Sequence, residues 1–176
     1  VDEAAAMDVL CADKTGTLTR NELRIAAVRP MAGFDTDDVL ALGALASSEG
    51  GQDPLDIVIR QAAQGKRSSD LPQLIQFPPF DPATKMAQAT VTLPASSEVQ
   101  RVIKGAFAVV SGQAQPSATA ATVAADLARQ GLRVLAVAMG PPAGITLVGL
   151  IALSDPPRQE AAALITELRG QIGRAH

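Results

Sequence analysis

The sequence predicts a mixed α/β fold with an antiparallel hairpin sheet at its centre, and three observations lead to this prediction. Several short segments alternate apolar and polar residues with the period of two that is typical of strands. Other segments are longer, begin after Asp, Ser or Pro, and end near Gly, as helices do. Short turns rich in Pro, Ser and Gly join neighbouring strand-like segments, so these can pair as hairpins. The chain has no internal repeat and no low-complexity segment.

The first third of the chain is expected to form two strands and two helices. Residues 7–13 are a short apolar run, as in a buried strand, and residues 23–27 alternate as an extended segment does. A helix over residues 39–47 follows a run of acidic N-cap candidates. A second helix over residues 53–64 begins at an Asp-Pro pair, which suits a first helical turn.

The rest of the chain is expected to form five strands and two helices. Strands are predicted over residues 74–80, 86–93 and 99–104, with clear alternation in the second, and two apolar runs predict further strands over residues 132–138 and 145–152. A helix over residues 120–130 is ended by Gly131. A pair of prolines precedes the final helix, over residues 158–169. The pattern is that of a mixed α/β protein.

The composition excludes several classes of function. The 176 residues carry a formal net charge of −3 and no basic run, so the electrostatic surface for nucleic acid binding is missing. Cys11 is the single cysteine, which excludes an internal disulfide. His176 is the single histidine, so a histidine-based triad or metal site is not available within the chain. No apolar run approaches the roughly 18–20 residues that cross a bilayer as a helix.

The most informative motif is the heptapeptide Asp-Lys-Thr-Gly-Thr-Leu-Thr at residues 13–19, directly after the first predicted strand. Asp13 is therefore expected at the carboxyl end of a buried strand, and Gly16 suits the tight turn that follows. A carboxylate surrounded there by hydroxyls and backbone N–H groups can attack a phosphoryl group. An isolated Asp-Lys pair would be better explained as a cap or a turn. The length and position of this motif favour a catalytic carboxylate.

This heptapeptide resembles the phosphorylation motif of the P-type cation-transporting ATPases. The resemblance implies that Asp13 accepts the γ-phosphate of ATP as an aspartyl phosphate, and that Asp13 and Thr15 contribute to an Mg²⁺ site. Phosphatases of the haloacid dehalogenase type are the alternative, but they commonly place a second Asp two residues after the nucleophile, where this chain has Thr15. A hydroxyl cannot activate water as a carboxylate does, so the acyl phosphate is expected to persist, as a pump requires.

The predicted ATP site is not of the P-loop kind, because the chain has no Gly-x-x-x-x-Gly-Lys-Ser/Thr loop. The segment Pro-Phe-Asp-Pro at residues 79–82, followed by Lys85, resembles the nucleotide-binding domain of the same family. There the counterpart of Phe80 stacks on adenine. Phe77 is expected to be a core residue, and a strand period of two would turn Phe80 to the opposite face. A phenylalanine at a strand end is otherwise most simply part of the core.

Three further segments match the same domain. Lys104 and Gly105 follow an apolar strand, where lysine can face phosphate or adenine and glycine permits a close approach by the ligand. The family counterpart of Arg133 reaches the nucleotide phosphates. Asp56 matches an acidic residue that can accept from the adenine amino group, whereas Asp53 is typical of a helix N-cap. The plainer alternatives are a solvated lysine, an arginine paired with a surface acid, and an acidic residue that only caps a helix.

The resemblance also predicts the domain organisation. Residues 1–20 are expected to begin a Rossmann-like phosphorylation domain of haloacid dehalogenase type, and residues 153–176 to return to it. Between them, residues 21–152 are expected to form the nucleotide-binding domain, a mostly antiparallel sheet flanked by helices. Asp155 and Arg158 belong to an Asp-Pro-Pro-Arg segment that matches the family hinge. We expect these two side chains to pair or to contact nucleotide.

The strings at residues 10–13 and 79–82 look most like the proton-pumping branch, with a magnesium-transporting branch as the alternative. The implied partners are ATP or ADP, the rest of the phosphorylation domain, the actuator domain and a membrane domain, at the cytoplasmic face of a membrane. The later acidic motif that completes the family's Mg²⁺ site has no match here. We therefore expect this chain to bind nucleotide without turnover. A non-catalytic interaction domain with the same fold is a further alternative.

Overall fold

The structure is a computed structural model in which two compact units are recognised. It describes residues 19–20, 22–65, 71–78, 82–94, 96–141, 144–156 and 158–171. The larger unit is Ile25–Ser154, and the smaller one consists of the described parts of Val1–Arg24 and Asp155–His176.

Some of the predicted features lie outside the described residues. These are the strand over residues 7–13, with Asp13 and Thr15 of the phosphorylation motif, and also Phe80. Within the described ranges, none of the helices has the length and apolar character needed to cross a membrane.

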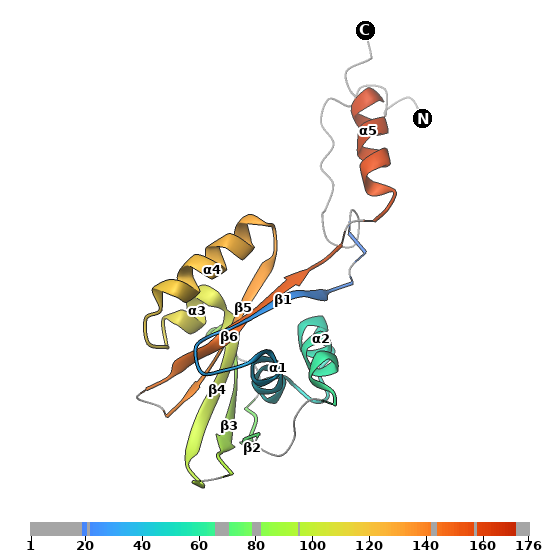
Figure 1. The fold of residues 1–176 in the computed structure, drawn as a ribbon. Helices are drawn as coiled ribbons and strands as arrows, with labels where there is room; N and C mark the ends of the chain where they lie inside the picture. Colours follow the sequence, from blue (N-terminus) through green and yellow to red (C-terminus); the bar gives the residue numbers. More distant parts are fainter. Residues whose placement is uncertain are drawn as a thin grey trace. The chain divides into compact units, whose positions relative to one another are not determined.

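The centre of the larger unit is a six-stranded sheet with the order β1-β6-β5-β4-β3-β2 (Figure 1). The four neighbouring pairs from β2 to β6 are antiparallel, which confirms the prediction of a mostly antiparallel sheet. The strands are β1 (Arg24–Pro30), β2 (Gln73–Gln76), β3 (Met86–Thr92), β4 (Val99–Ala106), β5 (Arg133–Gly140) and β6 (Thr146–Ser154).

Helices cover both faces of this sheet, α1 and α2 on one side and α3 and α4 on the other (Figure 1). The helices are α1 (Thr36–Leu45), α2 (Pro54–Ala63), α3 (Phe107–Ser111), α4 (Ala118–Arg129) and, in the smaller unit, α5 (Ala161–Gln171). The predicted caps are present at two helix starts. Asp35 and Asp38 form a capping box before α1, and the Asp53 side chain accepts a 2.9 Å hydrogen bond from the Leu55 N–H.

The alternation of side chains along β5 divides the core into two layers. Ala136 and Ala138 are buried in an apolar cluster with Leu127 of α4. Val137 points the other way, because a Cβ built on Gly43 of α1 would lie 3.5 Å from its Cγ2 atom. The same alternation in β4 decides which of its side chains face α1 and α2.

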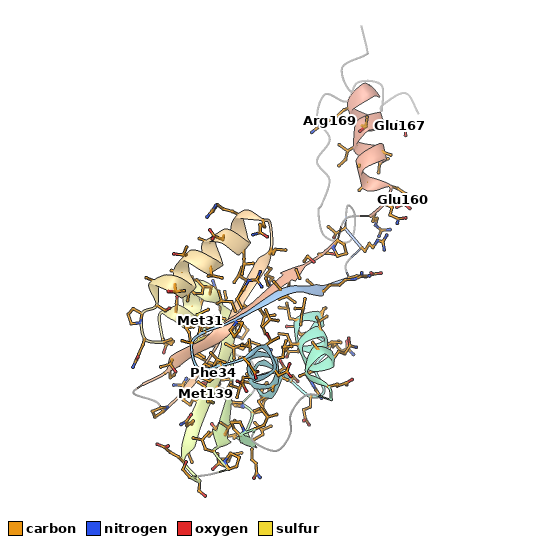
Figure 2. The ribbon with its side chains drawn as sticks, viewed as in Figure 1. Met31, Phe34, Met139, Glu160, Glu167 and Arg169 are labelled. Carbon is orange, nitrogen blue, oxygen red and sulfur yellow. The ribbon has the colours of Figure 1, made fainter. Side chains whose placement is uncertain are left out.

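Close packing between β6, β1 and α1 depends on a glycine. A Cβ on Gly149 would lie 2.5 Å from Cγ2 of Val39 and 2.8 Å from the carbonyl oxygen of Arg29, so no larger residue fits. The turn from β1 to α1 contains Met31 and Phe34 (Figure 2), and the Phe34 N–H donates to the Met31 carbonyl at 3.1 Å.

Two elements differ from the sequence-based predictions. β2 ends at Gln76, although the strand was predicted to continue to residue 80. Pro78 and Pro79 follow, and proline has no N–H to donate to a neighbouring strand. The short helix α3 was not predicted, because its five residues, Phe-Ala-Val-Val-Ser, are as apolar and β-branched as a strand.

Candidate functional site

Antiparallel pairing gathers three strand ends at one end of the sheet. Met86, at the start of β3, is paired with Gly105 near the end of β4. On the other side of β4, Ala106 is paired with Leu135 near the start of β5. Residues just before β3, at the end of β4 and at the start of β5 therefore lie together.

A cavity of about 700 Å³ opens at this end of the sheet, wholly within the larger unit. That volume is in the range of small-molecule sites. Five of the predicted nucleotide-binding residues line it, namely Asp56, Lys85, Lys104, Gly105 and Arg133. Residues far apart in the sequence thus meet at one cavity, which is the arrangement that the family resemblance predicts. The roles of the individual residues remain predictions.

Two parts of the cavity wall were not predicted from the sequence. Ser48 and Gln52, from the connection between α1 and α2, line the cavity, and so does Phe77. Phe77 was predicted to be a core residue, but it is only partly buried. The strand period of two does not extend to Phe77, because β2 ends one residue before it.

Lys104 lies at the inner wall of the cavity with only 4% of its surface exposed. The alternative of a solvated lysine is therefore wrong. Lys104 is paired in register with Val137, so its side chain is on the sheet face covered by α1 and α2. Its Nζ atom donates to Oδ1 of Asp56 at 2.5 Å and to the hydroxyl of Ser47. The helices that cover this face thus supply the acceptors that a buried ammonium requires.

Burial lowers the pKa of the Lys104 ammonium below its ordinary value of 10.5, because the charged form loses its hydration. The hydrogen bond to Asp56 and the charges of Asp56 and Asp53 act in the opposite direction. These interactions do not cancel the cost of burial. The acidic neighbours of Lys104 thus favour its charged form, and burial disfavours that form more strongly.

Asp56 connects Lys104 to the loop after α1. Its Oδ1 atom accepts from Lys104, and its Oδ2 atom accepts from the Ser48 N–H at 2.9 Å. Arg60, one turn further along α2, donates from Nη1 to the Ser48 carbonyl at 2.8 Å. The backbone of Ser48 is therefore fixed at both its N–H and its C=O. Asp53, as predicted, acts as the N-cap of α2.

Gly105 lies where the turn before β3 comes too close to β4 to leave room for a side chain. A Cβ at this position would lie 2.9 Å from the carbonyl oxygen of Lys85 and 3.3 Å from Cγ of Met86. Lys85 has a φ of 54°, in the left-handed region that disfavours side chains. The turn before β3 is thus pressed against β4 beside the cavity. Close approach of a ligand to Gly105 remains a prediction.

Lys85 and Arg133 are the exposed cations of the cavity. Among the described residues, neither forms an ion pair with a surface acid, in contrast to Arg24, Arg129 and Lys104. Their charges are available to an anionic group, whereas the charge of Lys104 is balanced by Asp56. The cavity therefore combines an inner Lys104–Asp56 pair with two exposed cations, Lys85 and Arg133, and one exposed acid, the α2 N-cap Asp53.

One feature of the sequence could have indicated that Ser47 and Ser48 belong near the site. Lys104 occupies a position two residues after Val102 in an apolar strand, so it shares a face with a core residue. A lysine at such a position needs a buried acceptor, and the hydroxyls of Ser47 and Ser48 precede Asp56 by less than ten residues. Ser47 is 3% exposed and donates to the Gly43 carbonyl at 2.8 Å.

The two predicted hinge residues both contact Thr19 in the smaller unit. Asp155 accepts from the Thr19 hydroxyl at 2.5 Å and from the Glu22 N–H at 3.2 Å. Arg158 donates from Nε to the Thr19 carbonyl at 3.2 Å. Two segments that are more than 130 residues apart are thus joined side by side. The helix that follows, α5, carries Glu167 and Arg169 (Figure 2).

In the part of the chain that the structure describes, no group of three or more His, Cys, Asp or Glu residues could hold a metal ion. The predicted Mg²⁺ ligands, Asp13 and Thr15, lie outside the described ranges. The Mg²⁺ site therefore stays a prediction from the resemblance.

Comparison with known proteins gives consistent matches over nearly the whole chain, although no family model matches it. A protein of Methanocaldococcus jannaschii named as a cation-transporting ATPase is 32% identical over 176 residues, which covers 96% of this chain and 22% of the relative. A plasma membrane ATPase of Dunaliella bioculata is 33% identical, covering 97% of this chain and 16% of the relative. The corresponding values for a plasma membrane ATPase of Kluyveromyces lactis are 31%, 96% and 20%.

The fold has a solved counterpart as well. The crystal structure of a zinc-transporting PIB-type ATPase matches with a TM-score of 0.60 and 25% identity, and covers 91% of this chain and 23% of that one. The chain thus spans about a fifth of the length of the proteins that it matches.

The antiparallel sheet, its cavity and these matches define a segment of a P-type ATPase. The chain belongs to the P-type cation-transporting ATPases, and its mostly antiparallel sheet with flanking helices has the fold of their nucleotide-binding domain. The predicted family is confirmed. Plasma membrane ATPases, which represent the branch placed first by the sequence analysis, are among the relatives.

Proposed function

We propose that the cavity of the larger unit binds the adenine nucleotide of a P-type pump. The observation that carries this proposal is the combination of a buried, charge-compensated Lys104–Asp56 pair with the exposed cations Lys85 and Arg133 around one cavity. A nucleoside phosphate has uncharged hydrogen-bonding groups at one end and phosphates at the other. The inner pair suits the base, and the exposed cations suit the phosphates.

Phe80 is proposed to stack on the adenine, as the family resemblance implies. Stacking of a base on an aromatic ring contributes about 1–3 kcal/mol. Phe80→Ala is therefore expected to weaken nucleotide binding roughly ten- to hundredfold. Phe77→Ala is an informative comparison, because Phe77 also lines the cavity. A larger loss for Phe77→Ala than for Phe80→Ala would show that Phe77 provides the stacking surface.

In the whole protein, we propose that the γ-phosphate of ATP is transferred to Asp13, with Mg²⁺ held in part by Asp13 and Thr15. The proposed overall activity is ATP-driven transport of a cation, and of a proton if the likeness to the plasma membrane branch extends to the transported ion. The chain would work at the cytoplasmic face of a membrane, together with the rest of the phosphorylation domain, an actuator domain and a membrane domain.

The proposed domain organisation follows the sequence analysis. Residues 1–20 and 153–176 are assigned to the phosphorylation domain, and residues 21–152 to the nucleotide-binding domain. The division of the described residues near positions 24 and 154 supports this assignment. Asp155 and Arg158, which fix Thr19, are proposed to hold the two connecting segments together. The relatives give no support to the phosphatase or magnesium-transport alternatives.

Titration of the chain with AMP, ADP and ATP, followed by amide chemical shifts, tests the nucleotide site. We expect perturbations at Lys104 and Gly105, and affinities that differ by a small factor if the base dominates binding. Unperturbed amides at all cavity residues with ATP in excess would support a non-catalytic interaction domain instead. Steady hydrolysis of nitrophenyl phosphate by the chain would revive the phosphatase alternative, and labelling of Asp13 by ATP would contradict the expected lack of turnover.

A further inference from the structure

Ser47 is a buried residue beside the cavity for which no role has been assigned. It lies two residues after the end of α1, with 3% of its surface exposed. Its hydroxyl makes two hydrogen bonds, one to the carbonyl of Gly43 at 2.8 Å and one with Nζ of Lys104. A serine that only ended a helix would need the first of these and not the second.

The direction of each hydrogen bond follows from the available donors and acceptors. A hydroxyl has one proton, and the Gly43 carbonyl can only accept, so the Ser47 proton is committed to Gly43. The Ser47 oxygen therefore presents a lone pair to Lys104, whose ammonium can only donate. The backbone at the end of α1 thus fixes the orientation of this acceptor.

Lys104 is consequently held at two points. Of its three N–H groups, one donates to Ser47 and one to Asp56, and no third acceptor is found among the described residues. Two fixed acceptors determine the direction of the third N–H, since the geometry at Nζ is tetrahedral. With Asp56 alone, the end of the Lys104 side chain could pivot about a single hydrogen bond as its last torsions change, and the third N–H would change direction.

The chemistry of this third N–H selects the kind of group that it can recognise. The charge of Lys104 is balanced by Asp56 at 2.5 Å, so the pair as a whole is close to neutral. Such a donor suits an uncharged acceptor, such as a ring nitrogen or carbonyl of a nucleobase. Phosphate oxygens are better served by Lys85 and Arg133, which are exposed and form no ion pair among the described residues, although the acid Asp53 lines the same cavity.

We propose that Ser47 is a positioning residue that, together with Asp56, aims one N–H of Lys104 at an acceptor atom of the nucleobase. This inference rests on the proposed nucleotide site and deepens it. It also gives Asp56 a role that acts through Lys104, in addition to any contact of its own with the adenine amino group.

The first test is Ser47→Ala in the full chain, with adenosine and ATP as the probes. We expect both affinities to fall by the same factor, about three- to tenfold, because the lost hydrogen bond orients a base contact and no phosphate contact. Thr122→Ala is the matched control. Its hydroxyl makes the same kind of bond to the carbonyl four residues earlier, on the exposed face of α4, so both affinities should be unchanged.

A double-mutant cycle with Lys104→Met separates positioning from a general effect on the fold. If Ser47 acts through Lys104, Ser47→Ala has no further effect on adenosine affinity in the Lys104→Met background. The same fractional loss in both backgrounds, or an unchanged affinity in Ser47→Ala alone, would overturn the inference.

A readout without ligand distinguishes failure of this inference from failure of the proposed function. In lysine-labelled protein, the Cε resonance of Lys104 reports its titration, and Ser47→Ala should lower the pKa of Lys104 further, because an acceptor of the charged form is lost. An unchanged titration would contradict the role of Ser47 whatever the chain binds. Absence of nucleoside binding to the unmodified chain would instead contradict the nucleotide site. If Ser47→Ala does not fold, Ser47→Cys keeps the size and offers a weaker acceptor, and the same shift in titration is expected.

Discussion

The two faces of the central sheet differ in what the same strand places on them. On the side of α3 and α4, Ile103 of β4 is buried in a cluster that consists only of apolar residues. On the side of α1 and α2, the next residue, Lys104, is buried almost as deeply but is bonded to Asp56 and Ser47. On the face of α3 and α4, stabilisation comes chiefly from apolar burial, with one part-buried hydrogen bond between Arg101 and Gln88. The other uses part of its area for a polar network beside a cavity.

This contrast shows that the fold can be stable without the polar network that forms part of the candidate site. Apolar burial on one face can stabilise the sheet while the other face carries a charge pair, whose contribution to stability is small or unfavourable once desolvation is counted. A polar network that adds so little to stability is consistent with the binding role proposed for the cavity.

The largest effect is expected from removing one partner of the buried pair. Lys104→Met leaves Asp56, whose side chain is only 13% exposed, without its counterion. We expect the free energy of unfolding to fall by about 3 kcal/mol, at the low end of the roughly 3–5 kcal/mol that breaking a buried pair typically costs. The double variant Lys104→Met/Asp56→Leu should recover most of that loss but still bind no nucleotide tightly. Urea unfolding measures the first quantity, and adenosine titration the second.

The opposite face provides the control for this pair of variants. Ile103→Val should cost about 0.5–1.5 kcal/mol and leave adenosine affinity unchanged, because Ile103 faces α3 and α4. A loss of affinity in Ile103→Val as large as that in the double variant would show that the two faces are not functionally separate.

Gly105 is expected to show the next largest effect. Gly105→Ala places a methyl group 2.9 Å from the Lys85 carbonyl, so the turn before β3 must move, at a cost of about 1–3 kcal/mol in the free energy of unfolding. Gly112→Ala is the control, since Gly112 has φ −71° and ψ −16°, which alanine adopts readily. Thermal unfolding should show a lower Tm for the first variant and an unchanged or higher one for the second. Equal Tm values would contradict the close approach.

The pH dependence of stability should reveal Lys104 as well. Because its pKa is lowered in the folded state, the unfolded chain binds more protons between that lowered pKa and 10.5. The contribution of Lys104 to the free energy of unfolding therefore rises with pH across this window and is constant below it. The measurement is the difference in stability between the unmodified chain and Lys104→Met as a function of pH. A difference that decreases towards pH 10.5 would have the wrong sign.

The smallest effect concerns the strained backbone of Lys85. Lys85→Gly should relieve a φ of 54° and raise the free energy of unfolding by up to about 1 kcal/mol. The same variant removes an exposed cation of the cavity, so ATP affinity should fall relative to adenosine affinity. Ser97→Gly has the same φ and does not line the cavity, so it should affect stability only. If both variants weaken ATP binding equally, the charge of Lys85 is not involved.

Particular residues show how far the sequence could predict this structure. Alternation in β3, which is buried at every second residue, and the caps at Asp35 and Asp53 were predicted because their signals are local. The burial of Lys104 was not predicted, because its acceptors are 48 and 57 residues away and belong to other elements. Phe77 was misassigned for a similar reason, since the end of β2 depends on pairing with β3.

The candidate site was predicted more completely than the reasons for it. Asp56, Lys85, Lys104, Gly105 and Arg133 were grouped by resemblance, and the structure brings them around one cavity. That Gly105 admits the Lys85 carbonyl and that Asp56 holds Lys104 are tertiary facts that no local pattern contains. A resemblance can thus identify the members of a site without showing which residues support the others.

The most direct test of the central claim is a titration of lysine-labelled chain with adenosine and, separately, with inorganic tripolyphosphate. Our account predicts that adenosine shifts the side-chain resonance of Lys104 and leaves that of Lys85 nearly unchanged, whereas tripolyphosphate does the reverse. A shift of Lys104 by tripolyphosphate but not by adenosine would contradict the division of the cavity into a base-binding inner pair and phosphate-binding exposed cations.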